Sequence, residues 1–363
     1  MTDPRFPVPE PASGVGSAAP SRHIALLSNY ARTASYREVL AKHAPDKVVA
    51  EIGCGSGVLA CFAARAGARR VYAIEQASVI GTAREIADVN GLSDRIVFIP
   101  GHSLDVELPE RADLVYAEVI SSDALSQHVP PYYRDARRRF LAPGGRVIPQ
   151  SLAINAVCVE SAAVAEFHYL GQQSIRRAKR LGELYGLELS PLVHAYEAEM
   201  RTARDSYAAL EMERLTGPFT DDQRTPRTKI LTDEVEIARF ELSVDEEEQP
   251  LRVPLEFGVT ASGTHNAVAI SFTAQLDNEI VLSTSPFSSQ LLPSWGQVVR
   301  PVAPAAGQQR EPVVAPGSHR PLHRRSSPCR VEPAGADEHR LRFPDRDHRR
   351  PTRRPRPRQP EAT

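Results

Sequence analysis

The chain has 363 residues, of which 41% are hydrophobic and 25% are charged, with 44 Lys and Arg against 45 Asp and Glu. This balance is typical of a folded protein of about two domains, and it excludes a chain that is disordered or fibrous throughout. The longest apolar run, residues 57–64, is far shorter than the ~18 residues that cross a bilayer, and the N-terminus has no signal-peptide pattern. We therefore expect a cytoplasmic protein without a membrane partner. The four cysteines have no metal-ligand spacing, so no metal site is predicted.

The net charge of −1 averages two unlike regions. Residues 301–363 hold 14 Arg, no Lys and seven acidic residues, or about +7, so residues 1–300 carry about −8. The same segment has 12 of the 31 prolines and one aromatic residue. Because it cannot bury enough apolar surface to offset its ordering entropy, we predict a disordered tail. Three explanations stay open: an inert tail, a phosphate-binding arm, or a shifted reading frame that truncates the preceding domain.

The first half of the chain reads as a layered α/β domain. Residues 1–21 are rich in proline and are predicted to form a flexible leader, and helical spacing of apolar residues begins near His23. From 47 to 150, apolar runs alternate with helical stretches, which is the pattern of a parallel sheet built from βαβ units. The predicted strands are 48–52, 71–75, 96–99, 113–117 and 146–149. The helices between them are expected at 57–66, 78–90 and 131–141.

The pattern changes after residue 150. Residues 151–160 are strand-like, 161–216 are mainly helical, and 229–300 hold several strand candidates. The sequence therefore predicts an α/β, Rossmann-like domain at 22–150, followed by a β-rich domain at 151–300 that carries a helical insertion. The strand candidates are 233–242, 251–259, 267–275 and 279–284.

A glycine-rich loop follows the first strand of the α/β domain. Gly53, Gly55 and Gly57 allow a sharp turn and the close approach of a ligand, although a tight strand–helix turn would use the same residues. Glu75 ends the second strand, where a carboxylate can accept hydrogen bonds from both ribose hydroxyls. Glu51, two residues before the loop, would repel a pyrophosphate but favour an ammonium group. S-adenosylmethionine combines adenosine with an amino-acid end and contains no phosphate, so it is the predicted cofactor.

The stretch VVAEIGCGSGVLACFAARAGARRVYAIE, residues 48–75, resembles the nucleoside-binding half of protein arginine methyltransferases. These are class I S-adenosylmethionine-dependent enzymes with a Rossmann-like domain followed by a β-barrel-like domain. The resemblance continues upstream in His23-x8-Arg32-Thr33-x2-Tyr36, and downstream in GHSLDVELP (101–109), LAPGGRVIP (141–149) and 283–297. It therefore spans about 22–300.

The resemblance implies roles for individual residues. Arg32 would pair with the methionyl carboxylate of the cofactor, and backbone groups of Ser103 and Leu104 would border the adenine. Glu118 begins the substrate loop, borders the cofactor, and would orient the methyl acceptor or accept its proton, with Asp123 as a helper. Together with Glu51, Glu75 and the three loop glycines, these residues form the predicted site.

The substrate loop departs from the family at two motif positions. The family carries a second glutamate nine residues after the first, where this chain has Gln127, and a motif histidine where this chain has Ser294. A guanidinium has a pKa above 12, and two carboxylates hold it better than a carboxylate and an amide. The leading interpretation is N-methylation of arginine in a protein or peptide. The alternatives are a small-molecule methyltransferase with the same cofactor, and a catalytically silent binding protein of the same fold.

Three further features carry expectations about partners and surfaces. Family members form dimers through a helical arm, and the insertion at about 184–225 would supply it in a homodimer. The run 137–139, three arginines, reads as a solvated helix face, and we do not expect nucleic acid as a partner. Trp295 would either line the acceptor pocket or fill the barrel.

Overall fold

The computed structural model describes residues 19–122, 124, 129–207, 212–213, 228–244, 255–289, 292, 295, 297–302 and 329–331. All of these residues belong to a single unit that extends from Met1 to Glu332. Within the described ranges, no helix combines the length and apolar character needed to cross a membrane.

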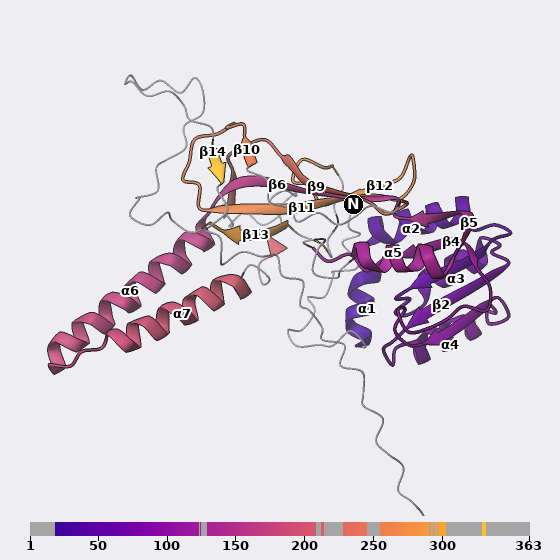
Figure 1. The fold of residues 1–363 in the computed structure, drawn as a ribbon, viewed down its shortest axis with the longest axis horizontal. Helices are drawn as coiled ribbons and strands as arrows, with labels where there is room; N and C mark the ends of the chain where they lie inside the picture. The colour runs from indigo at the N-terminus through magenta and orange to yellow at the C-terminus, as the bar shows by residue number, and fades with distance from the viewer. Residues whose placement is uncertain are drawn as a thin grey trace, which may run out of the picture. The chain divides into compact units, whose positions relative to one another are not determined.

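The first half of the chain forms a five-stranded parallel sheet in the order β3-β2-β1-β4-β5 (Figure 1). Its strands are β1 (Val48–Ile52), β2 (Arg70–Glu75), β3 (Ile96–Pro100), β4 (Ala112–Ala117) and β5 (Leu141–Ile148). The helices of this half are α1 (Pro20–Leu27), α2 (Tyr30–His43), α3 (Val58–Arg65), α4 (Ile80–Val89) and α5 (Val129–Arg139). Every residue of β1 is buried, as expected for the central strand of a sheet covered by helices.

The strand order reverses between β1 and β4, and ligands of open α/β sheets bind at such a switch point. Ile52 at the end of β1 is in register with Ile74 in β2 and with Ala117 in β4. The residues that come next, Gly53, Glu75 and Glu118, therefore lie along one edge of the sheet. This edge is the one that the sequence predicts to carry the site.

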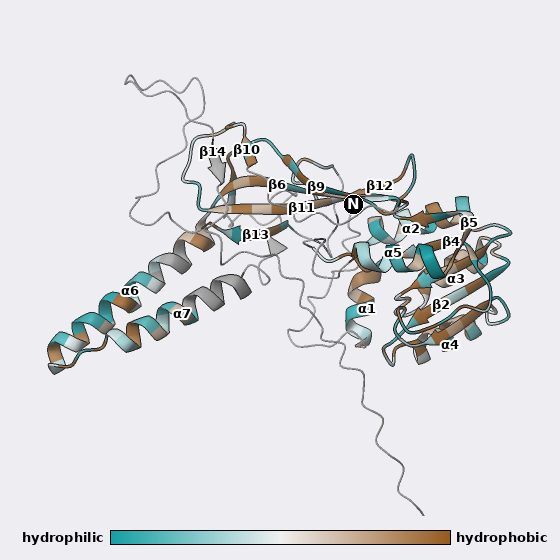
Figure 2. Cartoon of the chain, in the orientation of Figure 1, coloured by the Kyte–Doolittle hydropathy of each residue, from teal (hydrophilic) through white to brown (hydrophobic). Residues whose placement is uncertain are grey.

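The second half is built on an antiparallel sheet in the order β7-β13-β11-β6-β8, with β12 paired to β11 and β9 paired to β6. A separate two-stranded sheet joins β10 to β14. The strands are β6 (Ser151–Ser161), β7 (Met212–Glu213), β8 (Thr228–Ile230), β9 (Val235–Glu241), β10 (Leu255–Phe257), β11 (Ala267–Gln275), β12 (Val281–Ser283), β13 (Gln297–Pro301) and β14 (Cys329–Val331). Figure 2 shows that β6 and β11 are mainly apolar, whereas α5 is mainly polar. The larger sheet curls into a half-barrel, so the β-barrel-like second part of the fold is confirmed.

Two helices interrupt this sheet and lie side by side as an antiparallel hairpin (Figure 1). They are α6 (Ala162–Tyr185) and α7 (Ser190–Tyr207). The Ser161 side chain caps the start of α6 by accepting a hydrogen bond from the Val164 amide, and Gly186 ends it in a left-handed conformation with φ of +66°. The hairpin thus begins earlier than the predicted arm at 184–225, of which residues 208–211 and 214–225 lie outside the described residues.

The other elements follow the predictions closely. Each predicted strand and helix between 47 and 150 is present, with ends that differ by a few residues, except that β5 begins five residues earlier. Residues 1–18 of the predicted leader lie outside the described residues, and α1 begins at Pro20. Within the predicted tail, β13 ends at Pro301 and residues 329–331 form β14; residues 303–328 and 332–363 lie outside the described residues.

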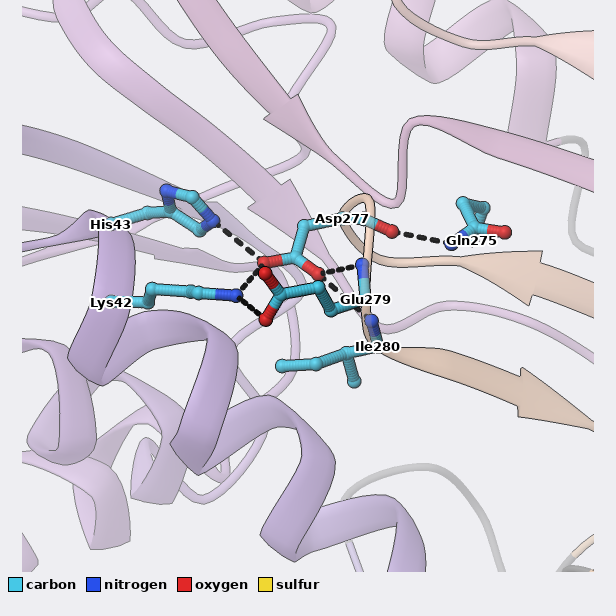
Figure 3. A network of polar contacts seen from close by, with 6 residues as sticks. All are labelled: Lys42, His43, Gln275, Asp277, Glu279 and Ile280. Atoms are coloured by element: carbon cyan, nitrogen blue, oxygen red, sulfur yellow. Dashed lines mark hydrogen bonds and ion pairs between the residues drawn. The ribbon is translucent and has the colours of Figure 1, made fainter.

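A polar network joins the end of α2 to the turn between β11 and β12 (Figure 3). The buried Asp277 carboxylate accepts hydrogen bonds from Lys42 Nζ at 3.1 Å and from the Glu279 and Ile280 amides at 2.9 and 2.8 Å, and it lies 2.9 Å from His43 Nε2. Burial by itself raises the pKa of Asp277, but these partners hold it well below its ordinary value. The network fixes α2, which carries Arg32, against the second half of the fold.

Candidate active site

The glycine loop between β1 and α3 has the backbone that the sequence predicts. Gly53, Gly55 and Gly57 have φ values of +72°, +53° and +73°, a region that other residues rarely adopt. A Cβ atom on Gly55 would lie 2.8 Å from His23 Cε1, and one on Gly57 would lie 2.9 Å from Ala83 Cβ. The positive φ favours glycine at both positions, and at Gly57 a side chain would also collide with Ala83 of α4, whereas at Gly55 it would meet only the end of the His23 side chain.

Glu75 lies at the end of β2 and is held by the loops beside it. One carboxylate oxygen accepts a hydrogen bond from the Gly55 amide at 2.9 Å, and the other accepts one from the Ala77 amide at 2.7 Å. The Glu75 carbonyl also accepts a hydrogen bond from the Gly101 amide at 3.0 Å. Each carboxylate oxygen has further lone pairs, so the oriented group can accept hydrogen bonds from two neighbouring hydroxyls.

Arg32 and Glu118 form a buried ion pair, and each side chain is 7% exposed. Asn29 caps α2 by accepting a hydrogen bond from the Arg32 amide. The Ala117 carbonyl, just before Glu118, accepts hydrogen bonds from the hydroxyls of Tyr36 and Tyr133 at 3.1 and 3.2 Å. Burial lowers the pKa of Arg32 to about 10, so it remains a cation at neutral pH. Helix α2 therefore brings a fixed positive charge to the end of β4.

Trp295 covers this pair from the second half of the fold. The Arg32 guanidinium carbon lies 5.7 Å from the centroid of the indole ring, within the range of a cation–π interaction. The indole nitrogen donates a hydrogen bond to the Ile120 carbonyl at 3.0 Å, and the ring packs edge-on against Phe272. Trp295 thus packs against the half-barrel and also contacts Arg32. That it lines the acceptor pocket stays a prediction.

Glu51 is a buried acid beneath the loop. Burial raises the pKa of Glu51 to about 8; the nearby Tyr116 hydroxyl opposes this shift, and the Glu75 carboxylate adds to it. A carboxyl group in this setting is mainly protonated at neutral pH. A cationic group placed beside it would favour the ionised form and would gain an attractive partner.

The loop after β3 contains the two residues expected to border adenine. Ser103 is buried, and its carbonyl accepts a hydrogen bond from Arg139. Leu104 is 41% exposed, and its amide donates to His102 Nδ1 at 3.3 Å. Both groups are therefore oriented by neighbouring side chains, and the loop adjoins Glu75 through the Gly101 amide.

The described side chains fit an amino-acid end of a ligand. Among the described residues, Arg32 Nε and Glu51 Oε2 are buried polar atoms without a hydrogen-bond partner. A carboxylate would satisfy the first atom and an ammonium group the second, since native structures pair nearly all of their buried polar groups. The two predicted charges of a methionyl group thus have matching partners at the same sheet edge as Glu75.

Comparisons with known proteins find similarity to methyltransferases. A family model described as ribosomal protein L11 methyltransferase matches residues 35–148. Arabidopsis thaliana probable protein arginine N-methyltransferase 6 is 37% identical over 130 residues, which cover 35% of this chain and 30% of the relative. Schizosaccharomyces pombe protein arginine N-methyltransferase 1 is 32% identical over 177 residues, 47% of this chain and 48% of the relative. The chain therefore spans less than half the length of these curated relatives.

The fold agrees with a solved structure of the same group. The Trypanosoma brucei PRMT1 enzyme–prozyme heterotetrameric complex with AdoHcy matches with a TM-score of 0.57 at 22% identity, over 79% of this chain and 83% of that chain. The chain is thus similar in sequence to protein arginine methyltransferases, and similar in fold to a solved structure of that name. Its sheet order and half-barrel are those that the sequence resemblance implies.

Three predicted residues lie outside the described part of the chain, and one prediction is wrong. Asp123, Gln127 and Ser294 lie outside the described residues, so the second half of the substrate loop stays a prediction. The run 137–139 is not a solvated face, because Arg137 donates to the Leu242 carbonyl and Arg139 binds the loop after β3. In this run the exposed side chain is that of Arg138. No spacing in the sequence indicates these contacts, since both join segments that are distant along the chain.

Proposed function

We propose that the chain is an S-adenosylmethionine-dependent methyltransferase that methylates a nitrogen of arginine in a protein or peptide. One observation carries the proposal: the Arg32 cation and the Glu51 acid each keep a buried unpartnered atom at the sheet edge where Glu75 ends β2. An adenosyl ligand with a zwitterionic end matches that arrangement. The sequence similarity to arginine methyltransferases, and the presence of AdoHcy in the Trypanosoma brucei complex, support the same cofactor.

The cofactor-binding roles follow from the chemistry of each group. Glu75 accepts hydrogen bonds from the ribose hydroxyls, and the loop of Gly53, Gly55 and Gly57 leaves room for the backbone of the ligand. Arg32 binds the carboxylate and Glu51 the ammonium group. Backbone groups of Ser103 and Leu104 meet the adenine.

The bound cofactor supplies an electrophilic methyl group on a sulfonium. In the free protein the Glu118 carboxylate is paired with Arg32 and buried. When a ligand carboxylate shares the Arg32 guanidinium, lone pairs of the Glu118 carboxylate become free to accept a hydrogen bond from an N–H of the acceptor. This hydrogen bond orients the acceptor nitrogen and stabilises the positive charge on the acceptor. Such positioning supplies most of the acceleration when one bound group displaces another. Asp123 is the proposed helper in the same loop.

An arginine acceptor agrees with the charge of the folded part. Residues 1–300 carry about −8, which attracts cationic peptides and speeds their encounter with the site. Gln127 favours the second candidate, a small-molecule methyltransferase, because it replaces a glutamate that grips the guanidinium in the family. Ser294 replaces the motif histidine and is a second departure from the family.

We also propose a homodimer joined through the α6–α7 hairpin, with 22–150 as the cofactor-binding domain and 151–300 as the substrate and dimerisation domain. The end of α6, the turn and the start of α7 expose large apolar side chains, each at least 59% accessible: Leu184, Tyr185, Leu187 and Leu192. Such a cluster is a typical protein contact surface. Light scattering tests the dimer, with a monomeric mass as the contradicting result. The cytoplasmic location is a further part of the proposal, tested by cell fractionation.

Transfer of a labelled methyl group tests the function. The full chain is incubated with methyl-labelled S-adenosylmethionine and a cell extract, which is then separated into protein and small-molecule fractions. The proposal expects label in protein, released on hydrolysis as methylarginine, and its loss in Glu118→Gln. Label confined to small molecules supports the second candidate, and no transfer to either fraction contradicts both.

A further inference from the structure

The loop that would meet the adenine, residues 101–106, is held in place from outside the predicted site. It follows β3, and its first amide, that of Gly101, donates to the Glu75 carbonyl at 3.0 Å. A base attached to a ribose on Glu75 would therefore lie beside this loop. The inference rests on the proposed function, because it concerns the adenine part of the proposed cofactor site.

One side chain of α5 binds the loop at two points. Arg139 Nη1 donates to the Val106 carbonyl at 2.6 Å, and Arg139 Nη2 donates to the Ser103 carbonyl at 2.5 Å. The guanidinium thus bridges two carbonyls three residues apart and fixes the curvature of the loop between them. A lysine ammonium has no planar fork and cannot hold both carbonyls in the same geometry.

Arg139 is itself held rigidly. Its Nε donates to one oxygen of Asp135 at 2.9 Å, its Nη2 binds the other oxygen, and its guanidinium carbon lies 4.6 Å from the centroid of the Phe140 ring. The hydrogen bonds to Asp135 also raise the pKa of Arg139, so the cation persists at any physiological pH. With a bidentate acid on one edge and an aromatic ring on one face, the guanidinium has little freedom to rotate.

Helix α5 also reaches the loop through a second contact. The Tyr132 hydroxyl lies 3.3 Å from His102 Nε2, and His102 Nδ1 lies 3.3 Å from the Leu104 amide nitrogen. Helix α5 therefore orients the Ser103 carbonyl, which keeps a second lone pair for the base, and through His102 it orients the backbone of Leu104, whose amide hydrogen is donated to His102. The position of α5 decides which hydrogen-bonding groups the loop presents at its inner edge.

We infer that Arg139 is a positioning residue for adenine recognition: it holds loop 101–106 in the shape that lets backbone groups of Ser103 and Leu104 distinguish the base. Removing the fork leaves the loop free to shift, so the selectivity for adenine falls more than the affinity for the rest of the nucleoside. The neighbouring Arg138 provides a matched control, because its side chain is exposed on the same helix.

Calorimetric titration of the full chain with two ligands tests the inference. The ligands are S-adenosylhomocysteine and S-inosylhomocysteine, in which a carbonyl replaces the adenine amino group and N1 carries a hydrogen. We expect wild type to prefer the adenosyl ligand by about tenfold, the effect of one mismatched buried hydrogen bond. In Arg139→Gln the preference for the adenosyl ligand shrinks to about twofold, because binding of that ligand weakens. Arg139→Lys should show an intermediate preference, and Arg138→Gln should show the wild-type preference.

The outcomes separate the inference from the proposed function. Equal weakening of both ligands in Arg139→Gln, or an unchanged preference, overturns the inference by showing that Arg139 only stabilises the fold. Wild type that binds both ligands equally also overturns it and leaves the function standing. Wild type that binds neither ligand contradicts the proposed function instead. Circular dichroism monitors folding, and Arg139→Lys supplies the comparison if Arg139→Gln does not fold.

Discussion

The buried acid beneath the glycine loop makes stability depend on pH in a direction opposite to that of most carboxylates. Burial raises the pKa of Glu51 to about 8 in the folded protein, against 4.5 as its ordinary value. The protonated form is therefore favoured by folding, and its stabilising contribution is complete below pH 4.5 and is lost as the pH rises through 8. One pKa unit corresponds to about 1.4 kcal/mol, so about 2 kcal/mol of unfolding free energy is lost between pH 6 and pH 8.

The substitution Glu51→Gln isolates this effect. Glutamine keeps the shape and polarity of the protonated acid but cannot ionise, so we expect its unfolding free energy to lack the Glu51 contribution to the pH dependence. Urea unfolding of both proteins at pH 6, 7 and 8 measures the difference, and Glu85→Gln on the exposed side of α4 serves as the control. A wild-type loss from pH 6 to pH 8 that persists undiminished in Glu51→Gln would refute the reasoning.

The same group links cofactor binding to a proton. A ligand ammonium group beside Glu51 favours the carboxylate, so binding below pH 8 releases a proton. Titration with S-adenosylhomocysteine at pH 7, in two buffers of different ionisation enthalpy, gives the number of protons released. We expect wild type to release between about 0.5 and 1 proton per ligand bound, and Glu51→Gln to release fewer by that amount. Equal values in the two proteins would place the proton elsewhere.

Two further predictions concern contacts with the second half of the fold. Asp277→Asn should lower the unfolding free energy by about 3 kcal/mol at pH 7, because it breaks a buried charged network. Glu279→Gln is the control: its side chain is 76% exposed, so the unfolding free energy should change by less than about 1 kcal/mol. The stabilising effect of Asp277 is present above pH 3.8 and is lost as the pH falls further. The unfolding free energies of the two variants, measured in urea, should therefore become equal in acid. Equal losses of unfolding free energy in both variants at pH 7 would contradict this role of Asp277. Trp295 is the single tryptophan of the chain and faces Arg32, so its fluorescence should change when S-adenosylhomocysteine binds, with no signal in Trp295→Phe. Unchanged emission in a sample that calorimetry shows to be saturated argues against a ligand near Arg32.

Local patterns were sufficient to predict the first half of the fold. The alternation of apolar runs with helical stretches placed each strand of the parallel sheet, because a buried central strand such as β1 is mainly apolar, with Glu51 as its one charged residue. The loop glycines and Glu75 could be predicted for the same reason: a sharp turn and a strand end are fixed by residues that are close in sequence. The half-barrel was predicted mainly from the resemblance, because the strand patterns after residue 150 are weaker and farther apart in the sequence than those of the first half.

Contacts between distant segments could not be predicted in this way. The pairing of Arg32 with Glu118 depends on the packing of α2 against the end of β4, and the approach of Trp295 depends on the half-barrel. Arg139 looked like one of three solvated arginines, because its partners lie 33 and 36 residues away in a loop without a pattern of its own. The spacing of charged residues indicates a surface only when no other segment packs against it.

The central claim is that this sheet edge binds S-adenosylmethionine, and calorimetric titration of the full chain with S-adenosylhomocysteine tests it most directly. The account predicts one site per chain with micromolar or tighter affinity, weakened by about tenfold or more in Glu75→Ala, which removes the ribose acceptor. Glu85→Gln should bind as wild type does. Absence of binding by wild type, or equal affinity in Glu75→Ala, would contradict the account.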